Sequence, residues 1–177
     1  MKKKRIGGKY MLYDIKIYGN ECLRTVAEPV TEITPEILEI LDNMVETMHE
    51  ANGVGLAAPQ VGISKRMFVI DVGDGIVRKI INPELIELSD TVENIDEGCL
   101  SVPGIYKPVK RSVTVKIKYL NEKGEEVIEE GTELLGRAFQ HEYDHLEAIL
   151  FVDKISPVAK RMVSKKLQLL KKEVGKN

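Results

Sequence analysis

Two histidines separated by four residues are the part of this sequence best suited to chemistry. His141 and His145 lie in the stretch Gln140-His141-Glu142-Tyr143-Asp144-His145. On an α-helix, residues i and i+4 lie on one face, so both imidazoles can point at one metal ion. Glu142 then lies close enough to act on a metal-bound water without binding the metal itself. The alternative is a buried helix with two satisfied core histidines, but the intervening glutamate favours a metal site.

The residues around the histidines predict the helix that such a site requires. Thr132 can cap its N-terminus, and Glu133 suits the positive end of the helix dipole. Apolar residues then recur at helical spacing, with the histidines among them: Leu134, Leu135, Ala138, Phe139, Leu146 and Ile149. We therefore expect the histidines to point into the fold.

The sequence after the histidines does not supply the third ligand of the common metalloprotease patterns. A catalytic site for zinc or a similar metal needs about three protein ligands and an open position for water. One such pattern requires a glycine and a third histidine after His145, but this chain has Ala148 and Phe151 there. Another requires a downstream glutamate, but the later glutamates lie too close to His145 or near the C-terminus. Cys99 remains as a soft ligand, and a Cys-His-His set suits zinc or iron(II).

The composition indicates one domain with an ample hydrophobic core. The chain has 177 residues, of which 43% are hydrophobic, and a formal net charge of −2. This charge gives no sign of a nucleic-acid-binding protein, and no apolar stretch is long enough to span a membrane. We interpret the protein as cytoplasmic. Cys22 and Cys99 could pair, but a reducing compartment argues against a disulfide.

The first third of the chain predicts an extension, a short strand and a helix. Residues 1–10 are basic, contain glycine and lack an apolar period, so we expect a flexible extension. Residues 14–18 could form a short strand. A helix over 35–52 follows, because Thr34 is a capping residue and a proline occupies the first helical position. His49 lies near the end of this helix and is assigned a structural role or none.

The remaining elements indicate an α+β fold. Strands are expected in four stretches with β-type patterns: 65–72, 77–88, 113–119 and 125–130. A last helix begins at Ser156 and Pro157, with an apolar stripe made of Ala159, Met162, Val163, Leu167, Leu170 and Val174. We predict antiparallel or mixed β-sheets packed around a central metal-binding helix, with a C-terminal helix, in a single catalytic domain over 11–177.

Three stretches carry a resemblance to a known family. They are Gly53-Val54-Gly55-Leu56-Ala57-Ala58-Pro59-Gln60, Glu97-Gly98-Cys99-Leu100-Ser101 and the histidine stretch described above. In order and separation they resemble the three signature motifs of peptide deformylases, and the similarity runs from about Met11 to the C-terminus. The terminal helix resembles the bacterial type I branch. The resemblance implies a metal-dependent hydrolase that removes the formyl group from the N-terminal formyl-methionine of newly synthesised proteins and releases formate.

The resemblance also implies roles for particular residues. A divalent metal ion would be held by Cys99, His141 and His145, with iron(II) as the native ion and zinc, nickel or cobalt as possible substitutes. Glu142 would move protons, and the Gln60 amide with the Leu100 backbone N–H would stabilise an oxyanion. The peptide backbone would bind Val54 and Gly55, the methionine side chain would contact Leu134 and Ala138, and Glu97 and Arg111 would form a supporting pair, for which the alternative is a surface ion bridge.

The C-terminal helix suggests a second partner besides formyl-methionyl nascent peptides. Its lysines oppose the apolar stripe: Lys160, Lys165, Lys166, Lys171 and Lys172. A charged outer face is usually only solvated, yet lysines also bind the phosphates of RNA in a salt-dependent way. By resemblance we expect this helix to bind the ribosome surface, with no membrane and no sequence-specific nucleic acid among the partners.

Two rival functions and two departures from the family pattern remain. A non-catalytic metal-binding module would use the same ligands but would need neither Glu142 nor Gln60, and a metalloprotease lacks its third ligand. The family usually has glycine where this chain has Ala148. The first ten residues extend beyond the usual start, so Met11 is an alternative initiator.

Overall fold

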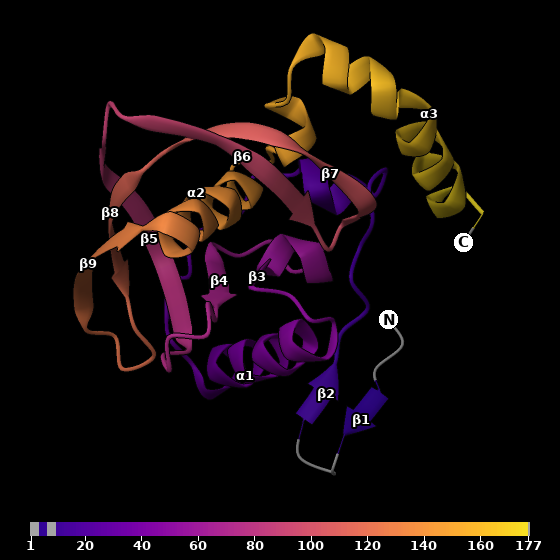
Figure 1. The fold of residues 1–177 in the computed structure, drawn as a ribbon. Helices are drawn as coiled ribbons and strands as arrows, with labels where there is room; N and C mark the ends of the chain where they lie inside the picture. Colours follow the sequence, from indigo (N-terminus) through magenta and orange to yellow (C-terminus); the bar gives the residue numbers. More distant parts are fainter. Residues whose placement is uncertain (1–3, 7–9, 177) are drawn as a thin grey trace.

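The computed structural model describes residues 4–6 and 10–176, with side chains from residue 10 onward. Its three α-helices are α1 (Pro35–Glu50), α2 (Glu133–Leu146) and α3 (Pro157–Val174), and short 3-10 helices span Glu21–Arg24, Ala58–Val61 and Phe151–Asp153. No helix in the described ranges is long and apolar enough to cross a membrane. Figure 1 shows α2 in the centre of the molecule and α3 at one edge.

The described strands form three antiparallel sheets. Five strands pair in the order β3-β4-β5-β8-β9, with the bounds β3 (Gly55–Ala57), β4 (Met67–Ile70), β5 (Arg78–Leu88), β8 (Thr114–Leu120) and β9 (Glu126–Thr132). A long hairpin consists of β6 (Val92–Cys99) and β7 (Val102–Ser112), and a short one consists of β1 (Lys4–Ile6) and β2 (Tyr10–Leu12). This arrangement confirms the predicted α+β class.

The core packs the three helices against these sheets. Phe139 and Leu146 of α2 belong to a buried cluster with Phe68 and Ile117 of the five-stranded sheet. On the other side of β3 and β4, α1 contributes Leu41, Met44 and Met48 to a second cluster. The third cluster joins α3 to β7. Buried apolar surface thus surrounds α2, so the histidine helix is held rigidly.

Local capping signals predicted the helix starts well. The Thr34 hydroxyl accepts a hydrogen bond from the Ile37 N–H at 3.3 Å, and the Ser156 hydroxyl accepts one from the Ala159 N–H at 3.1 Å. Thr132 is the N-cap residue of α2, but its side chain makes no capping hydrogen bond. The start of α2 is therefore determined by its connection to β9 rather than by a side-chain cap.

Two other expectations were wrong. Residues 14–18 form no strand; instead the Lys16 and Tyr18 N–H groups donate to the carbonyl oxygens of Gln60 and Ser101, at 2.7 and 2.8 Å. Met162 is 70% exposed, because it lies on the outer face of α3 rather than in the buried stripe. Of the predicted flexible extension over 1–10, residues 1–3 and 7–9 lie outside the described residues, while Lys4–Ile6 pairs with β2.

Candidate active site

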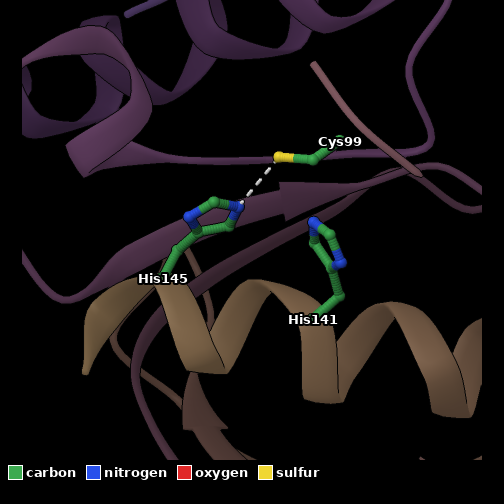
Figure 2. A group of neighbouring side chains, drawn as sticks. All are labelled: Cys99, His141 and His145. Carbon is green, nitrogen blue, oxygen red and sulfur yellow. Dashed lines mark hydrogen bonds between the residues drawn. The ribbon is translucent and has the colours of Figure 1, made fainter. Parts of the chain in front are cut away.

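Cys99, His141 and His145 come together although the cysteine and the first histidine are 42 positions apart in the sequence. Cys99 is the last residue of β6, and both histidines project from one face of α2 (Figure 2). The Cys99 Sγ lies 3.3 Å from the His145 Nε2. One ligand atom from each of the three residues lies within 4.8 Å of the others. The fold thus brings together the three residues predicted to hold a metal.

The donor set fits a divalent metal ion. Metal–ligand bonds of about 2.0–2.3 Å in tetrahedral geometry place ligand atoms roughly 3.3–3.8 Å apart. The Cys99 Sγ and His145 Nε2 atoms, 3.3 Å apart, match this spacing. The His141 Nδ1 is 2.5 Å from the Glu97 Oε1, which leaves Nε2 available toward the cysteine. A thiolate with two imidazoles suits zinc or iron(II) rather than calcium or magnesium.

A buried ionic network lies behind His141. Arg111 donates two hydrogen bonds to Glu97, at 3.1 and 2.7 Å, and one to Asp144 at 2.6 Å. Arg137 donates to Glu97 at 2.9 Å and to the Val109 carbonyl oxygen at 2.9 Å. Glu97 and Arg111 are only 6% and 5% exposed. The pair is therefore no surface ion bridge, and it fixes the orientation of the His141 ring.

The same surroundings shift the pKa values of two carboxyl groups of the site. Burial raises the pKa of Glu142 to about 7, although the charge on His141 opposes this. Burial also opposes ionisation of Glu97, but hydrogen bonds from His141 and Arg111 hold its pKa well below the ordinary value. Glu142 is thus a carboxyl group that can gain or lose a proton near neutral pH.

Gln60 presents its amide nitrogen to the site. Its Oε1 accepts a hydrogen bond from the Ala57 N–H at 2.8 Å. The Nε2 therefore faces the cleft, where it donates to the Ser101 Oγ at 3.1 Å and to the Cys99 Sγ at 3.5 Å. Gln60 is 1% exposed, so this donor is held in place by the surrounding structure. Leu100 follows Cys99 directly and lines the same cleft.

A cleft of about 420 Å³ opens beside these groups. All four residues predicted to bind the substrate line it: Val54, Gly55, Leu134 and Ala138. Gly55 packs so closely against Glu142 that a Cβ atom at this position would overlap the Glu142 Oε1. Glycine is therefore required here by a neighbouring side chain, in addition to any close approach of a ligand.

Sequence reasoning missed three residues of the site. Arg137 and Asp144 lie four residues before and three residues after His141, so helical periodicity placed them near its face, but nothing identified their partners. Tyr106 lines the cleft, is 68% exposed and rests its ring on the backbone of Gly98. No local pattern distinguishes Tyr106 from an ordinary strand residue, and only the fold reveals its position.

Comparisons with known proteins agree with this arrangement. The family model of polypeptide deformylase matches residues 12–161. A peptide deformylase from Fusobacterium nucleatum is 54% identical over 165 residues, which cover 92% of this chain and 95% of that protein. The crystal structure of peptide deformylase from Thermotoga maritima has a TM-score of 0.80 at 47% identity and covers 82% of this chain and 99% of that one. A deformylase structure from Plasmodium falciparum reaches a TM-score of 0.89 at 36% identity, with coverages of 93% and 98%. The chain therefore belongs to the polypeptide deformylase family.

Proposed function

We propose that this chain is a metal-dependent hydrolase that removes the formyl group from the N-terminal formyl-methionine of newly synthesised proteins. One observation carries the proposal: Cys99 and His141 of the ligand set line one cleft with a buried carboxyl group, Glu142, and a buried amide donor, Gln60, and His145 completes the set beside them. The Glu142 Oε2 has no protein hydrogen-bond partner among the described residues. A carboxyl oxygen that is buried without a protein partner is suited to exchanging protons with a bound reactant.

Different residues of the chain carry out different parts of the proposed reaction. A divalent ion held by Cys99, His141 and His145 would supply a Lewis acid and an activated water. Glu142 accepts the proton of the attacking water and passes it to the leaving amine, first as base and then as acid. The Gln60 Nε2 and the Leu100 N–H donate to the oxygen of the formyl group as negative charge develops on it.

Residues near β3 and at the start of α2 would accept the peptide. The strand β3 ends the five-stranded sheet, so one of its edges is not paired within that sheet. A substrate in extended conformation would add to this edge through the backbone of Val54 and Gly55. Leu134 and Ala138 lie four residues apart on α2 and line the cleft next to His141, where they would contact the methionine side chain.

We further propose iron(II) as the native ion, with zinc, nickel or cobalt as substitutes, and the cytoplasm as the compartment. A thiolate ligand donates strongly to a soft or borderline metal, which supports the iron(II) assignment. The substrate is a nascent chain, so the enzyme acts where translation occurs. The free thiols of Cys22 and Cys99 are consistent with a reducing compartment.

The C-terminal helix is proposed to bind the ribosome. All five lysines predicted for this role are exposed, and Lys166 also donates a hydrogen bond to the Gly104 carbonyl oxygen at 2.9 Å. Replacing the other four lysines with glutamine is expected to weaken co-sedimentation with ribosomes while sparing hydrolysis of a short formyl-peptide. If co-sedimentation of the variant is unchanged across a range of salt concentrations, the charged face of α3 is only solvated and does not bind the ribosome.

The proposed reaction is tested by formate release. Protein purified anaerobically is analysed for bound metal and then mixed with a formyl-methionyl tripeptide. Stoichiometric formate that depends on the metal supports the proposal, and an acetylated peptide of the same sequence serves as the control. Full metal occupancy without formate release would favour a non-catalytic metal-binding module instead.

A further inference from the structure

His49 and Asp71 form a contact that the proposed chemistry does not use. The His49 Nε2 lies 2.8 Å from the Asp71 Oδ2. His49 belongs to the last turn of α1, and Asp71 follows β4 directly. Neither residue lines the cleft. Val54, which does line it, lies in the connection between α1 and β3 that begins just after His49.

Asp71 joins three segments of the chain at this point. Its own N–H donates to the Val54 carbonyl oxygen at 2.9 Å, and its Oδ1 accepts from the Gly73 N–H at 2.9 Å. The Gly73 N–H and then the His49 imidazole hold the pKa of Asp71 below its ordinary value, so the carboxylate is ionised at neutral pH. An ionised carboxylate only accepts hydrogen bonds, so the His49 ring donates to it.

The segment before Val54 is anchored at its other end by α1 itself. The Asn52 N–H donates to the His49 carbonyl oxygen at 3.0 Å, and the Gly53 N–H donates to the Met48 carbonyl oxygen at 2.9 Å. These bonds complete the C-terminal cap of α1. The His49 side chain therefore links the C-terminal cap of α1 to Asp71, and Val54 is held between these two points.

We propose that His49 is a positioning residue for the peptide-binding edge. By its contact with Asp71, His49 fixes the backbone of Val54 in the position in which Val54 pairs with an extended substrate. The inference rests on the proposed function and adds a residue to it. His49 and Asp71 are partly exposed, with side-chain exposures of 44% and 24%, so their pair contributes little to global stability. The pair instead affects the position of the Val54 backbone. Longer peptides should lose the most affinity when this position shifts, because they make more backbone contacts.

The test compares two substrates in two variants. His49→Ala is expected to raise the KM for a formyl-methionyl tripeptide by about three- to tenfold, the effect of one weakened hydrogen-bonding arrangement. The kcat and the KM for formyl-methionine amide stay near their wild-type values. His49→Gln keeps a donor that can reach Asp71, so it restores most of the tripeptide KM.

Lys65→Ala is the matched control, because it removes another exposed ion pair, Lys65 with Glu28 at 3.3 Å, away from the cleft. This control is expected to leave both KM values unchanged. An unchanged tripeptide KM in His49→Ala, an equal rise for both substrates, or no rescue by glutamine would overturn the positioning role while leaving the hydrolase proposal intact. Absence of formate release from the metal-loaded wild-type protein would overturn both.

Discussion

Buried charges hold the reacting groups on one wall of the cleft, whereas backbone hydrogen bonds and one exposed pair hold the other. On the α2 side, Glu97 and Arg111 are almost fully buried and orient His141. On the β3 side, Val54 is bound by the Asp71 N–H, and the supporting His49 is partly exposed. The two walls thus use interactions of different strength.

This difference follows from what each wall must do. Metal ligands and proton donors need fixed positions, and buried, hydrogen-bonded charges provide them because the cost of leaving any partner unpaired is high. A wall that accepts peptides needs an unpaired backbone edge, which must face solvent until substrate arrives. Substitutions among the groups that hold the metal and orient its ligands should therefore affect metal binding and kcat, and substitutions that move the backbone edge at Val54 should affect KM.

The largest loss of stability is expected from removing Arg111. Arg111→Met leaves Glu97 and Asp144 buried without the guanidinium that binds both, although Glu97 keeps His141 and Arg137. This should cost about 3–5 kcal/mol of stability and weaken metal binding about 10- to 100-fold. Chemical denaturation and metal titration measure these two effects.

Arg78→Met is the matched control. Arg78 is also buried, at 6% exposure, and binds Asp74 and Glu129 away from the cleft. Arg78→Met should lose less stability than Arg111→Met, because Asp74 and Glu129 are 36% and 23% exposed, and the folded variant should keep its metal affinity. Equal losses of metal affinity in both variants would mean that Arg111 acts only through general stability, and the comparison of the two walls would fail.

A smaller loss of stability is expected at Gln60, together with a loss of turnover. Gln60→Leu should lower kcat about 100- to 1,000-fold with little change in KM, because the amide matters most when the oxyanion forms. The substitution also leaves the Ala57 N–H without its acceptor, which costs about 1–3 kcal/mol of stability. Kinetics are therefore measured where the variant is fully folded. A raised KM with normal kcat would place Gln60 among the residues that bind the ground state.

The smallest change in stability is expected at the C-terminal ends of α1 and α2. Both α1 and α2 end in the same hydrogen-bonding motif, and its left-handed position holds Asn52 in α1 (φ 54°) and Ala148 in α2 (φ 60°). Glycine is favoured there, asparagine is tolerated, and alanine is strained. Ala148→Gly should therefore stabilise the protein by about 0.5–1 kcal/mol.

Asn52→Gly is the comparison for that measurement and should give a smaller gain in the free energy of unfolding. If glycine at position 148 destabilises the protein, the alanine must contribute packing that outweighs its backbone strain. Either result shows what the departure from the family pattern does to the end of the histidine helix.

The sequence predicted most of the fold because the relevant signals are local. Caps and prolines marked the starts of α1 and α3, a run of apolar residues marked β4, and alternation marked β8. The predicted strand at 14–18 failed because its alternating apolar residues, Ile15 and Ile17, lie in a segment that hydrogen-bonds to loops instead of to a sheet. The division into an extension over 1–10 and a domain over 11–177 remains a prediction.

The sequence predicted only those residues of the site that belong to recognisable motifs. The spacing of His141 and His145 indicated a metal site, but the pairing with Cys99 relied on elimination and on the family resemblance. The contacts of Arg111 with Asp144 and of His49 with Asp71 join segments that are 33 and 22 residues apart. Such contacts depend on how the elements pack, and no local pattern in one sequence encodes them.

The central claim is that Cys99, His141 and His145 bind one metal ion while Glu142 moves protons without binding it. The most direct test measures bound metal and formate release on the same anaerobic samples of wild type, Glu142→Ala and Cys99→Ala. We predict that Glu142→Ala keeps one metal ion per chain and loses about 10²- to 10⁴-fold in turnover, whereas Cys99→Ala loses metal. Near-wild-type formate release from Glu142→Ala, or full metal occupancy in Cys99→Ala, would contradict this account.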